Sequence, residues 1–353
     1  MTHFALMGCG RIAKRHATLL AGGHVRGAKL IAVCDTQADR AKKFGKEFGV
    51  NSYQDMEEMM LKEKIDVVCV LTPSGLHAEH VIALSKFRKH IVVEKPMALT
   101  LESADAMIQA CDEQGIKLFV VKQNRFNLPV VRLREALVAG AFGKLVMGTV
   151  RVRWCRDQSY YDADPWRGTW ALDGGVIANQ ASHHIDLLEW MLGRVESVFA
   201  KSIHGLVDTE TEDTAVALLK FRSGALGVVE ATTATRPVDL EGSISILGEK
   251  GSVEIGGFAV NEMKVWKFAG QTAAQEQAII REHSVNPPNV YGFGHQAYLQ
   301  HVVDCLDGGQ SALVDGLEGR KSLELITGIY ESIETGREVP LSFRAQKCKL
   351  GQR

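Results

Sequence analysis

The chain has no long hydrophobic run, no paired cysteines and no excess of charge of either sign. None of its apolar stretches approaches the roughly 18 residues that cross a bilayer, so no membrane association is expected. Its 353 residues hold 41 Lys and Arg against 42 Asp and Glu, which leaves a formal net charge of −1. Proteins that bind the nucleic-acid backbone are usually basic, so a nucleic-acid partner is disfavoured.

Cysteine usage indicates a reducing compartment. The seven cysteines are scattered along the chain, and no two of them form a CxxC pair. This pattern argues against a disulfide framework and against a thiolate zinc site. Residues 1–7 lack the basic start of a signal peptide and have the pattern of a strand. We therefore expect a cytoplasmic protein.

The length of the chain and the change in its hydrophobic pattern predict two domains, residues 1–123 and 124–353. In the first, short apolar runs alternate with amphipathic segments of helical periodicity. The expected strands are 4–7, 30–34, 67–71, 91–93 and 118–121, and the expected helices include 37–48, 77–87 and 101–114. Unalternated apolar strands between helices indicate a parallel sheet that is covered on both faces. The first domain is therefore predicted to be a doubly wound α/β domain of the Rossmann type.

The second part of the chain changes to alternating strands that are joined by short turns. The expected strands are 146–154, 198–204, 214–221, 225–232, 243–247 and 252–255. Such a succession predicts an α+β domain with a large, mostly antiparallel open sheet. Helices are expected at 175–192, 292–306 and 317–335, and Pro287-Pro288 marks a loop.

A glycine turn, GCGRIA at residues 8–13, follows the first strand directly and opens a helix. Gly8 allows the tight turn, and a side chain at Gly10 would hold the backbone away from a pyrophosphate. Ala13 lets helix and strand pack closely, and the helix N-terminus offers free N–H groups to phosphates. This turn predicts a dinucleotide site.

Asp35 ends the second expected strand, 25 residues after Gly10. A carboxylate at this position accepts hydrogen bonds from the adenosine ribose diol and repels a 2′-phosphate. The acid therefore favours NAD over NADP, with NADP kept as the alternative because Arg40 lies nearby in the sequence.

Two further segments follow strands of the same sheet. The TPS segment 72–74, with His77, follows one strand, and the EKP segment 94–96 follows the next. Open α/β sheets bind their ligands at the carboxyl ends of strands. Both segments are therefore expected to lie beside the dinucleotide.

With these motifs, the antiparallel second domain and a helix that carries His183, the chain resembles the Gfo/Idh/MocA family of NAD(P)-dependent oxidoreductases over nearly its whole length. The resemblance implies NAD as cofactor and places Lys95 and His183 at the nicotinamide as catalytic residues. The cofactor-binding residues that it implies are Gly8, Gly10, Arg11, Ile12, Asp35, Thr72, Pro73, Ser74, His77, Glu94, Lys95, Gln123, Trp166 and Arg167.

Segments 122–127 (KQNRFN), 152–156 (VRWCR) and 179–184 (NQASHH) resemble one subgroup, the UDP-N-acetylglucosaminuronate 3-dehydrogenases of bacterial surface-polysaccharide (lipopolysaccharide) biosynthesis. This likeness implies NAD-dependent oxidation of the C3 hydroxyl of UDP-2-acetamido-2-deoxy-D-glucuronate, with 2-oxoglutarate recycling the NADH. The implied substrate-binding residues are Lys95, Asn124, Arg125, Arg153, Arg156, Asn179 and His183.

The identity of the proton acceptor stays open at this point. The neutral imidazole of His183 could take the hydroxyl proton near physiological pH, and a charged Lys95 would stabilise an alkoxide. Many family members carry Asp where this chain has Asn179, and a neutral amide cannot take a proton. We expect Asn179 to hydrogen-bond the substrate from the face of the 175–192 helix that also carries His183 and Asp186.

An anionic nucleotide sugar calls for arginines, whose planar fork matches carboxylate and phosphate oxygens. By alternation, Arg151 and Arg153 share one face of their strand, and Val150 and Val152 share the other. If the valines face a core, the arginines face solvent or a neighbouring subunit.

No metal is expected, because neither His77 with His80 nor His183 with His184 and Asp186 supplies a tetrahedral ligand set. The resemblance also implies a homo-oligomer, a dimer or tetramer, formed through the second-domain sheet. Two alternatives accompany the nucleotide-sugar reading. One is a dehydrogenase of a free polyol or simple sugar, and the other is a non-catalytic NAD-sensing regulator.

Overall fold

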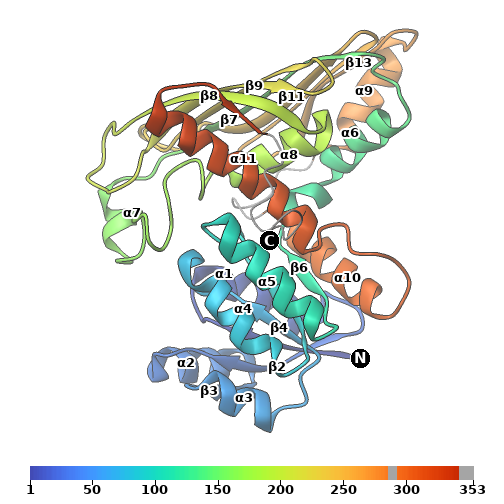
Figure 1. Cartoon of the computed structure of the whole chain (residues 1–353). Coiled ribbons are helices and arrows are strands. Elements are labelled where there is room, and N and C mark those ends of the chain that lie inside the picture. The colour runs from blue at the N-terminus through green and yellow to red at the C-terminus, as the bar shows by residue number, and fades with distance from the viewer. Residues whose placement is uncertain (285–291, 342–353) are drawn as a thin grey trace, which may run out of the picture.

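The computed structural model describes residues 1–284 and 292–341, and Pro287 and Pro288 lie outside this part of the chain. Figure 1 shows a smaller sheet with its helices at one end of the molecule and a larger sheet at the other. Two helices, α8 (Ser182–Leu192) and α11 (Gly316–Thr335), lie between the larger sheet and the N-terminal domain. Within the described ranges, no helix has the length and hydrophobicity that a membrane crossing requires.

The smaller sheet has six parallel strands in the order β3-β2-β1-β4-β5-β6. This is the strand order of the dinucleotide-binding Rossmann fold, so the predicted doubly wound domain is confirmed. The strands are β1 (Thr2–Met7), β2 (Ala28–Cys34), β3 (Asn51–Tyr53), β4 (Val67–Val70), β5 (His90–Val93) and β6 (Leu118–Val120). Sequence reasoning missed β3, because this short polar edge strand has no apolar run to announce it.

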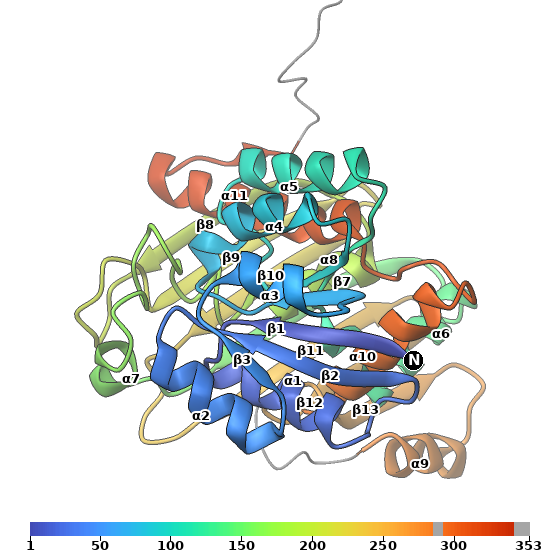
Figure 2. The ribbon, with the colours of Figure 1, turned by 90° about the horizontal axis from the view of Figure 1, so that it is seen from below.

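Helices cover both faces of this sheet. Figure 2 shows α4 and α5 on one side of the strands and α1 and α2 on the other. The helices are α1 (Arg11–Ala21), α2 (Ala38–Phe48), α3 (Met56–Lys62), α4 (His77–Ser85) and α5 (Leu101–Glu113). All four residues of β4 are fully buried, which explains why its sequence is apolar without alternation.

The larger sheet has eight strands in the order β13-β12-β11-β7-β10-β9-β8-β14. Its neighbours run antiparallel except for β7 and β10, which are parallel, so the predicted mostly antiparallel sheet is confirmed. The strands are β7 (Leu145–Arg153), β8 (Val195–Ile203), β9 (Thr214–Phe221), β10 (Leu226–Thr232), β11 (Glu241–Gly248), β12 (Gly251–Gly256), β13 (Glu262–Phe268) and β14 (Val339–Pro340).

Side-chain alternation divides the larger sheet into a covered face and an open face. On β9, Ala217 and Leu219 are buried, whereas Val216 and Leu218, which alternate with them, are about half exposed. The buried residues pack in one core with Ile185 and Leu188 of α8. The opposite face is therefore the open one.

Helix α8 begins at Ser182, seven residues later than the sequence indicates. The segment before it forms turns: the Ala181 N–H donates to the carbonyl of Val176, five residues back, where a helix would use the carbonyl of Ile177. Val176 N–H donates to the carbonyl of Glu212, and Ile177 N–H donates to the Glu212 carboxylate. Asn179 consequently lies in a turn before α8 and not on one helix face with His183.

The chain returns to the N-terminal domain near its end. Helix α10 (Gly294–Leu306) packs Tyr298 and Leu299 into the same core as Phe4 and Leu6 of β1. Three further helices, α6 (Leu128–Val138), α7 (Gln158–Asp162) and α9 (Ala273–Glu282), and two short 3₁₀ turns, η1 (Ser74–Leu76) and η2 (Gln123–Phe126), complete the described fold. Helix α10 therefore belongs to the core of the N-terminal domain, whereas Leu325 and Ile329 of α11 pack into the core under the larger sheet.

Candidate active site

The glycine turn leaves room for a phosphate group. Gly8 has a φ of +98°, and a Cβ atom there would lie 2.8 Å from the carbonyl oxygen of Leu71, so only glycine fits. A Cβ at Gly10 would meet no atom of residues 1–284 and 292–341 within 4 Å. Gly10 is the N-cap residue of α1 and has no side chain with which to cap it, so the first N–H groups of that helix can receive an anion. The turn fits a dinucleotide pyrophosphate.

Asp35 lies at the end of β2 beside this turn. One carboxylate oxygen accepts the Cys9 N–H at 2.9 Å, and the other accepts the Gln37 N–H at 2.9 Å. Arg40 approaches the first oxygen at 3.7 Å but is largely exposed. The two backbone bonds hold the carboxylate at the strand end where the ribose diol of NAD is expected.

His77 joins the two strand-end segments from inside the protein. Its ring nitrogens lie 2.9 Å from the Thr72 carbonyl and 2.8 Å from the Pro96 carbonyl, and the residue is buried. The structure therefore gives His77 contacts within the chain. It connects the TPS and EKP segments, both of which are predicted to touch the cofactor.

The Glu94 carboxylate is held by two buried histidines, His16 and His295. Its Oε1 atom lies 3.0 Å from His16 Nε2 and 3.9 Å from His295 Nε2, and its Oε2 atom accepts the Lys95 N–H at 3.1 Å. Burial opposes the charge, but the hydrogen bond and charge of His16 bring the pKa of Glu94 down to about 2. The ionised carboxylate thus fixes the backbone from which the Lys95 side chain extends.

The Lys95 side chain crosses from the first domain to the second. Its ammonium donates to the Asn179 carbonyl oxygen at 2.8 Å and to Asn179 Oδ1 at 3.2 Å. Burial lowers the pKa of Lys95, and the negative charges of Glu94 and Asp173 oppose that shift. Asn179 precedes His183 by four residues and lies just before α8, so the Lys95 amine lies near the start of that helix.

His183 projects from the first turn of α8, and Gln123 from η2 reaches it. The Gln123 Nε2 atom lies 2.9 Å from His183 Nε2, while His183 Nδ1 has no hydrogen-bond partner in the part of the chain that the structure describes. Burial lowers the pKa of His183 well below its usual value, and the charges of Lys95 and Lys122 add to the effect. The imidazole is therefore neutral at physiological pH and can accept a proton.

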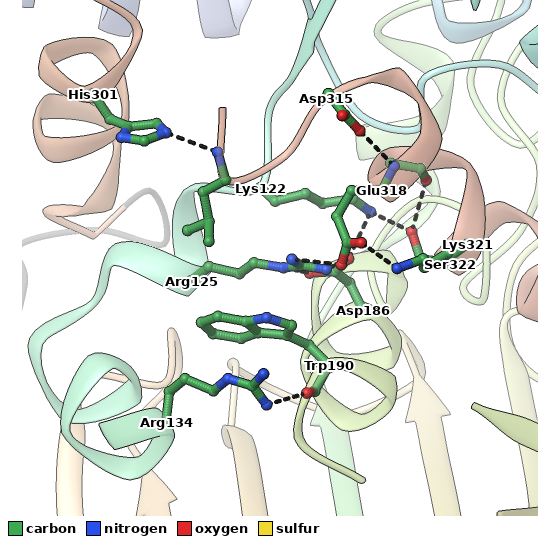
Figure 3. Close-up of polar contacts among 12 residues, drawn as sticks. Lys122, Arg125, Arg134, Asp186, Trp190, His301, Asp315, Glu318, Lys321 and Ser322 are labelled. Atoms are coloured by element: carbon green, nitrogen blue, oxygen red, sulfur yellow. Dashed lines mark hydrogen bonds and ion pairs between the residues drawn. The ribbon is translucent and has the colours of Figure 1, made fainter. Parts of the chain in front are cut away.

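Arg125 lies in a buried ion network between the domains. Its guanidinium forms two 2.8 Å hydrogen bonds to Asp186 and a 3.0 Å bond to Glu318. Figure 3 shows it stacked on the Trp190 ring, with Arg134 on the other face of that ring. These contacts use the guanidinium within the protein, so we do not place Arg125 in the substrate set below.

Arg153 lies on the open face of the larger sheet. Its guanidinium donates to Glu230 at 2.5 and 2.8 Å and pairs with Glu241 at 2.9 Å. Val150 and Val152 face the core, so the condition under which the sequence places Arg151 and Arg153 on the opposite face is met. Arg153 therefore faces away from Lys95 and His183.

Three arginines from the two domains surround Tyr160, which was not among the predicted site residues. Their guanidinium carbons lie 4.5 Å (Arg167), 5.4 Å (Arg156) and 5.6 Å (Arg11) from the ring centre. Arg167 also donates to the Tyr160 hydroxyl at 2.5 Å and stacks on Trp166. Arg11 begins α1 beside the glycine turn, so the cluster forms a cationic region suited to phosphate groups.

The remaining predicted residues lie in the same segments. Ser74 is buried in η1, Thr72 and Pro73 are partly exposed before it, and Asn124 is buried in η2. Asp173, which precedes Asn179 by six residues, was not among the predicted site residues. Its isolated carboxylate has no periodic signal, and only the folded turn brings it to Asn179.

The chain matches both parts of one protein family. Residues 2–122 match its NAD-binding Rossmann domain, and residues 134–341 match its C-terminal alpha/beta domain. Among curated relatives, the myo-inositol 2-dehydrogenase of Thermotoga maritima is 29% identical over 95% of this chain and 97% of its own length. The NAD(+)-dependent scyllo-inositol 2-dehydrogenase of Bacillus subtilis is 27% identical over 96% of each chain.

Solved structures give a second comparison. The WlbA dehydrogenase of Bordetella pertussis, in complex with NADH and UDP-GlcNAcA, superposes with a TM-score of 0.91 at 42% identity, over 97% of this chain and 98% of that one. The WlbA dehydrogenase of Chromobacterium violaceum, with the same ligands, gives 0.90 at 43%, over 98% and 97%. The chain therefore belongs to the Gfo/Idh/MocA oxidoreductase family and is an NAD-dependent dehydrogenase that acts on CH–OH groups.

Proposed function

We propose that the protein oxidises the C3 hydroxyl of UDP-2-acetamido-2-deoxy-D-glucuronate to a ketone with NAD. The observation that carries this proposal is the likeness, at 42% and 43% identity over nearly the whole chain, to two dehydrogenases that bind NADH and UDP-GlcNAcA. The neutral His183 and the Lys95 amine, whose charge acts on that imidazole, supply the acid–base chemistry that the reaction needs.

In the proposed reaction, bound NAD accepts the hydride from the carbinol carbon. His183 accepts the proton of the hydroxyl group at Nε2. Burial keeps the imidazole neutral, and the Gln123 amide nitrogen, which only donates, faces Nε2 and so places the lone pair of the ring there. Lys95 stabilises the negative charge that develops on the oxygen. The amides of Asn179 and Asn124 hydrogen-bond the sugar, and Gln123 orients the imidazole through the 2.9 Å contact.

The anionic parts of the ligands are assigned to the arginines around Tyr160. Arg11 is placed on the cofactor pyrophosphate, because it begins the helix that follows the glycine turn. Arg156 and Arg167 keep one carboxylate partner each, Asp239 at 2.9 Å and Asp164 at 2.9 Å. We assign Arg167 to the cofactor and Arg156 to the nucleotide sugar.

We further propose that the 3-keto sugar serves bacterial surface-polysaccharide synthesis and that 2-oxoglutarate reoxidises the NADH. Both ideas rest on the resemblance of segments 122–127, 152–156 and 179–184 to the UDP-sugar subgroup. An NADH-loaded sample that is oxidised by 2-oxoglutarate in the absence of sugar would support the second idea.

The open face of the larger sheet is proposed to pair with a second copy of the chain, giving a dimer or tetramer. Phe199, Val216 and Leu218 are 37%, 45% and 55% exposed there, and Phe199 pairs with Leu218 across β8 and β9. Such a row of exposed apolar side chains is typical of an interface. Light scattering coupled to size-exclusion chromatography measures the number of copies.

The central experiment offers the protein NAD with UDP-2-acetamido-2-deoxyglucuronate, other UDP-uronates and free polyols, with and without 2-oxoglutarate. NADH absorbance follows turnover, and mass spectrometry identifies the product that has lost two hydrogens. Oxidation of the N-acetylated uronate at C3 supports the proposal. Oxidation of polyols alone contradicts it.

A second candidate function is oxidation of a free inositol. Two curated relatives that match nearly the whole chain are inositol dehydrogenases, although their identity is lower, at 27% and 29%. In that case myo-inositol or scyllo-inositol would be oxidised faster than any UDP-sugar at equal concentration.

A further inference from the structure

Asp173, which was not among the residues predicted from the sequence, connects two parts of the site, the segment of Asn179 and the segment of Gly168. It is 1% exposed and lies in the turn region before α8. Its Oδ1 atom accepts a hydrogen bond from Asn179 Nδ2 at 2.5 Å, and its Oδ2 atom accepts one from the Gly168 N–H at 2.9 Å. Each carboxylate oxygen therefore holds a different segment of the second domain.

The first of these bonds decides which end of the Asn179 amide faces Lys95. An ionised carboxylate only accepts hydrogen bonds, so it selects the NH₂ end of the amide. The Oδ1 end is then the one that lies 3.2 Å from Lys95 Nζ. The reversed amide would set its NH₂ group against the ammonium, and donor would face donor.

The second bond holds the turn that carries Arg167. Gly168 follows Arg167 directly and has a φ of +65°, the left-handed region in which other residues are strained. Its N–H is bound by Asp173, and its carbonyl accepts the Glu210 N–H. One carboxylate thus stabilises both the turn beside Tyr160 and the amide beside Lys95.

Asp173 also contributes negative charge close to Lys95. The charged groups that act on the Lys95 amine are Glu94 and Asp173, which favour the ammonium, and Lys122 and Arg167, which oppose it. Burial raises the pKa of Asp173, and the Gly168 N–H and the Lys95 charge counter that rise. Removing the Asp173 charge would therefore lower the pKa of Lys95 further.

We propose that Asp173 is a positioning residue for the dehydrogenase reaction, which orients the Asn179 amide so that it presents two oxygen atoms to the Lys95 ammonium. The proposal rests on the proposed role of Lys95 in catalysis. It does not depend on which alcohol is the substrate, because the contacts involve the chain alone.

The test compares Asp173→Asn with wild type, using whichever alcohol the wild type oxidises, with UDP-2-acetamido-2-deoxyglucuronate and myo-inositol tried first. We expect kcat to fall by about tenfold to a hundredfold, because misplacement of a catalytic group by about an ångström costs that much. KM should change much less. The limb of the pH profile of kcat that reports Lys95 should move to lower pH by about one unit, the shift expected when an adjacent opposite charge is lost.

Two further variants separate positioning from folding. The double variant Asp173→Asn/Asn179→Asp exchanges carboxylate and amide across the same hydrogen bond and restores negative charge beside Lys95. It should return the limb toward its wild-type position and recover part of kcat. The control Asp162→Asn removes an exposed carboxylate on α7 and should leave both unchanged.

A readout without turnover keeps this test apart from the substrate proposal. Competitive acetylation of the Lys95 amine over a range of pH, quantified by mass spectrometry, measures its pKa in each variant. A lower pKa in Asp173→Asn and recovery in the double variant support the proposal even if every alcohol tried is refused. An unchanged Lys95 pKa, or a loss confined to thermal stability, would overturn it.

Discussion

Glu212 offers a sharp prediction about stability. It is 3% exposed, and its Oε1 atom accepts hydrogen bonds from the Ile177 N–H and the Tyr330 hydroxyl, both at 3.0 Å. Its Oε2 atom has no partner among residues 1–284 and 292–341. Burial raises the pKa of Glu212 from 4.5 to about 7, against the opposing hydrogen bonds. The folded protein therefore holds a proton that the unfolded chain releases.

The sign of the pH dependence follows from this difference. Below about pH 4.5, Glu212 is protonated in both the folded and the unfolded state and does not reduce the free energy of unfolding. Between 4.5 and about 7 it ionises only in the unfolded state, so the free energy of unfolding falls as pH rises. At about 1.4 kcal/mol for each pKa unit, the full loss is roughly 3 kcal/mol. Glu212→Gln keeps an oxygen for Ile177 and Tyr330 and has no charge to lose.

The assay is urea unfolding of wild type and Glu212→Gln at about pH 5 and about pH 8.5, on either side of most of the titration. Relative to the wild type, the free energy of unfolding of the variant should increase by about 2 to 3 kcal/mol from the lower pH to the higher one. Glu196→Gln, an exposed residue paired with Lys220, is the matched control and should show no such gain. A difference between variant and wild type that does not grow with pH would refute the reasoning.

Four other predictions concern the site and its support. Lys95→Ala and His183→Ala should each abolish turnover while NADH still binds, as measured by fluorescence, and near-normal turnover would remove that residue from the mechanism. Asp35→Ala should weaken NAD binding by about tenfold to a hundredfold in calorimetry, because it loses charged hydrogen bonds to the ribose; an unchanged affinity would place the ribose elsewhere. Arg125→Met should destabilise the protein by about 3–5 kcal/mol in thermal or urea unfolding, because the buried Asp186 loses both hydrogen bonds of its arginine and keeps only the longer 3.7 Å contact with Lys122; a neutral effect would contradict the network in Figure 3. Leu218→Glu should shift the protein toward the monomer in light scattering, and an unaltered mass would exclude this face as the interface.

Much of the fold could be predicted because burial leaves a periodic record in the sequence. The four apolar residues of β4 are buried on both faces, and β9 alternates because only one of its faces is covered. The polar strand β3 and the start of α8 have no such record. The start of α8 depends on the turns at residues 176–181, where the Ala181 N–H bonds to the Val176 carbonyl and Glu212 accepts the N–H groups of residues 176 and 177.

The arginines show where prediction of the site stops. Their number indicated an anionic ligand, but the sequence does not say which negative charge each one meets. Arg125 pairs with Glu318, 193 residues away, and Arg153 pairs with glutamates on neighbouring strands. Such partners depend on how distant segments pack, and local spacing holds no information about that.

The sequence by itself determined the dinucleotide turn at Gly8 and Gly10 and the acid at the end of β2, because these features act within one βαβ unit. The tertiary structure alone decided that Lys95 reaches Asn179 and that Asp173 turns that amide toward it. The physical reason is range. A turn and its following helix are set by neighbouring backbone angles, whereas a hydrogen bond between two domains exists only once both cores have packed.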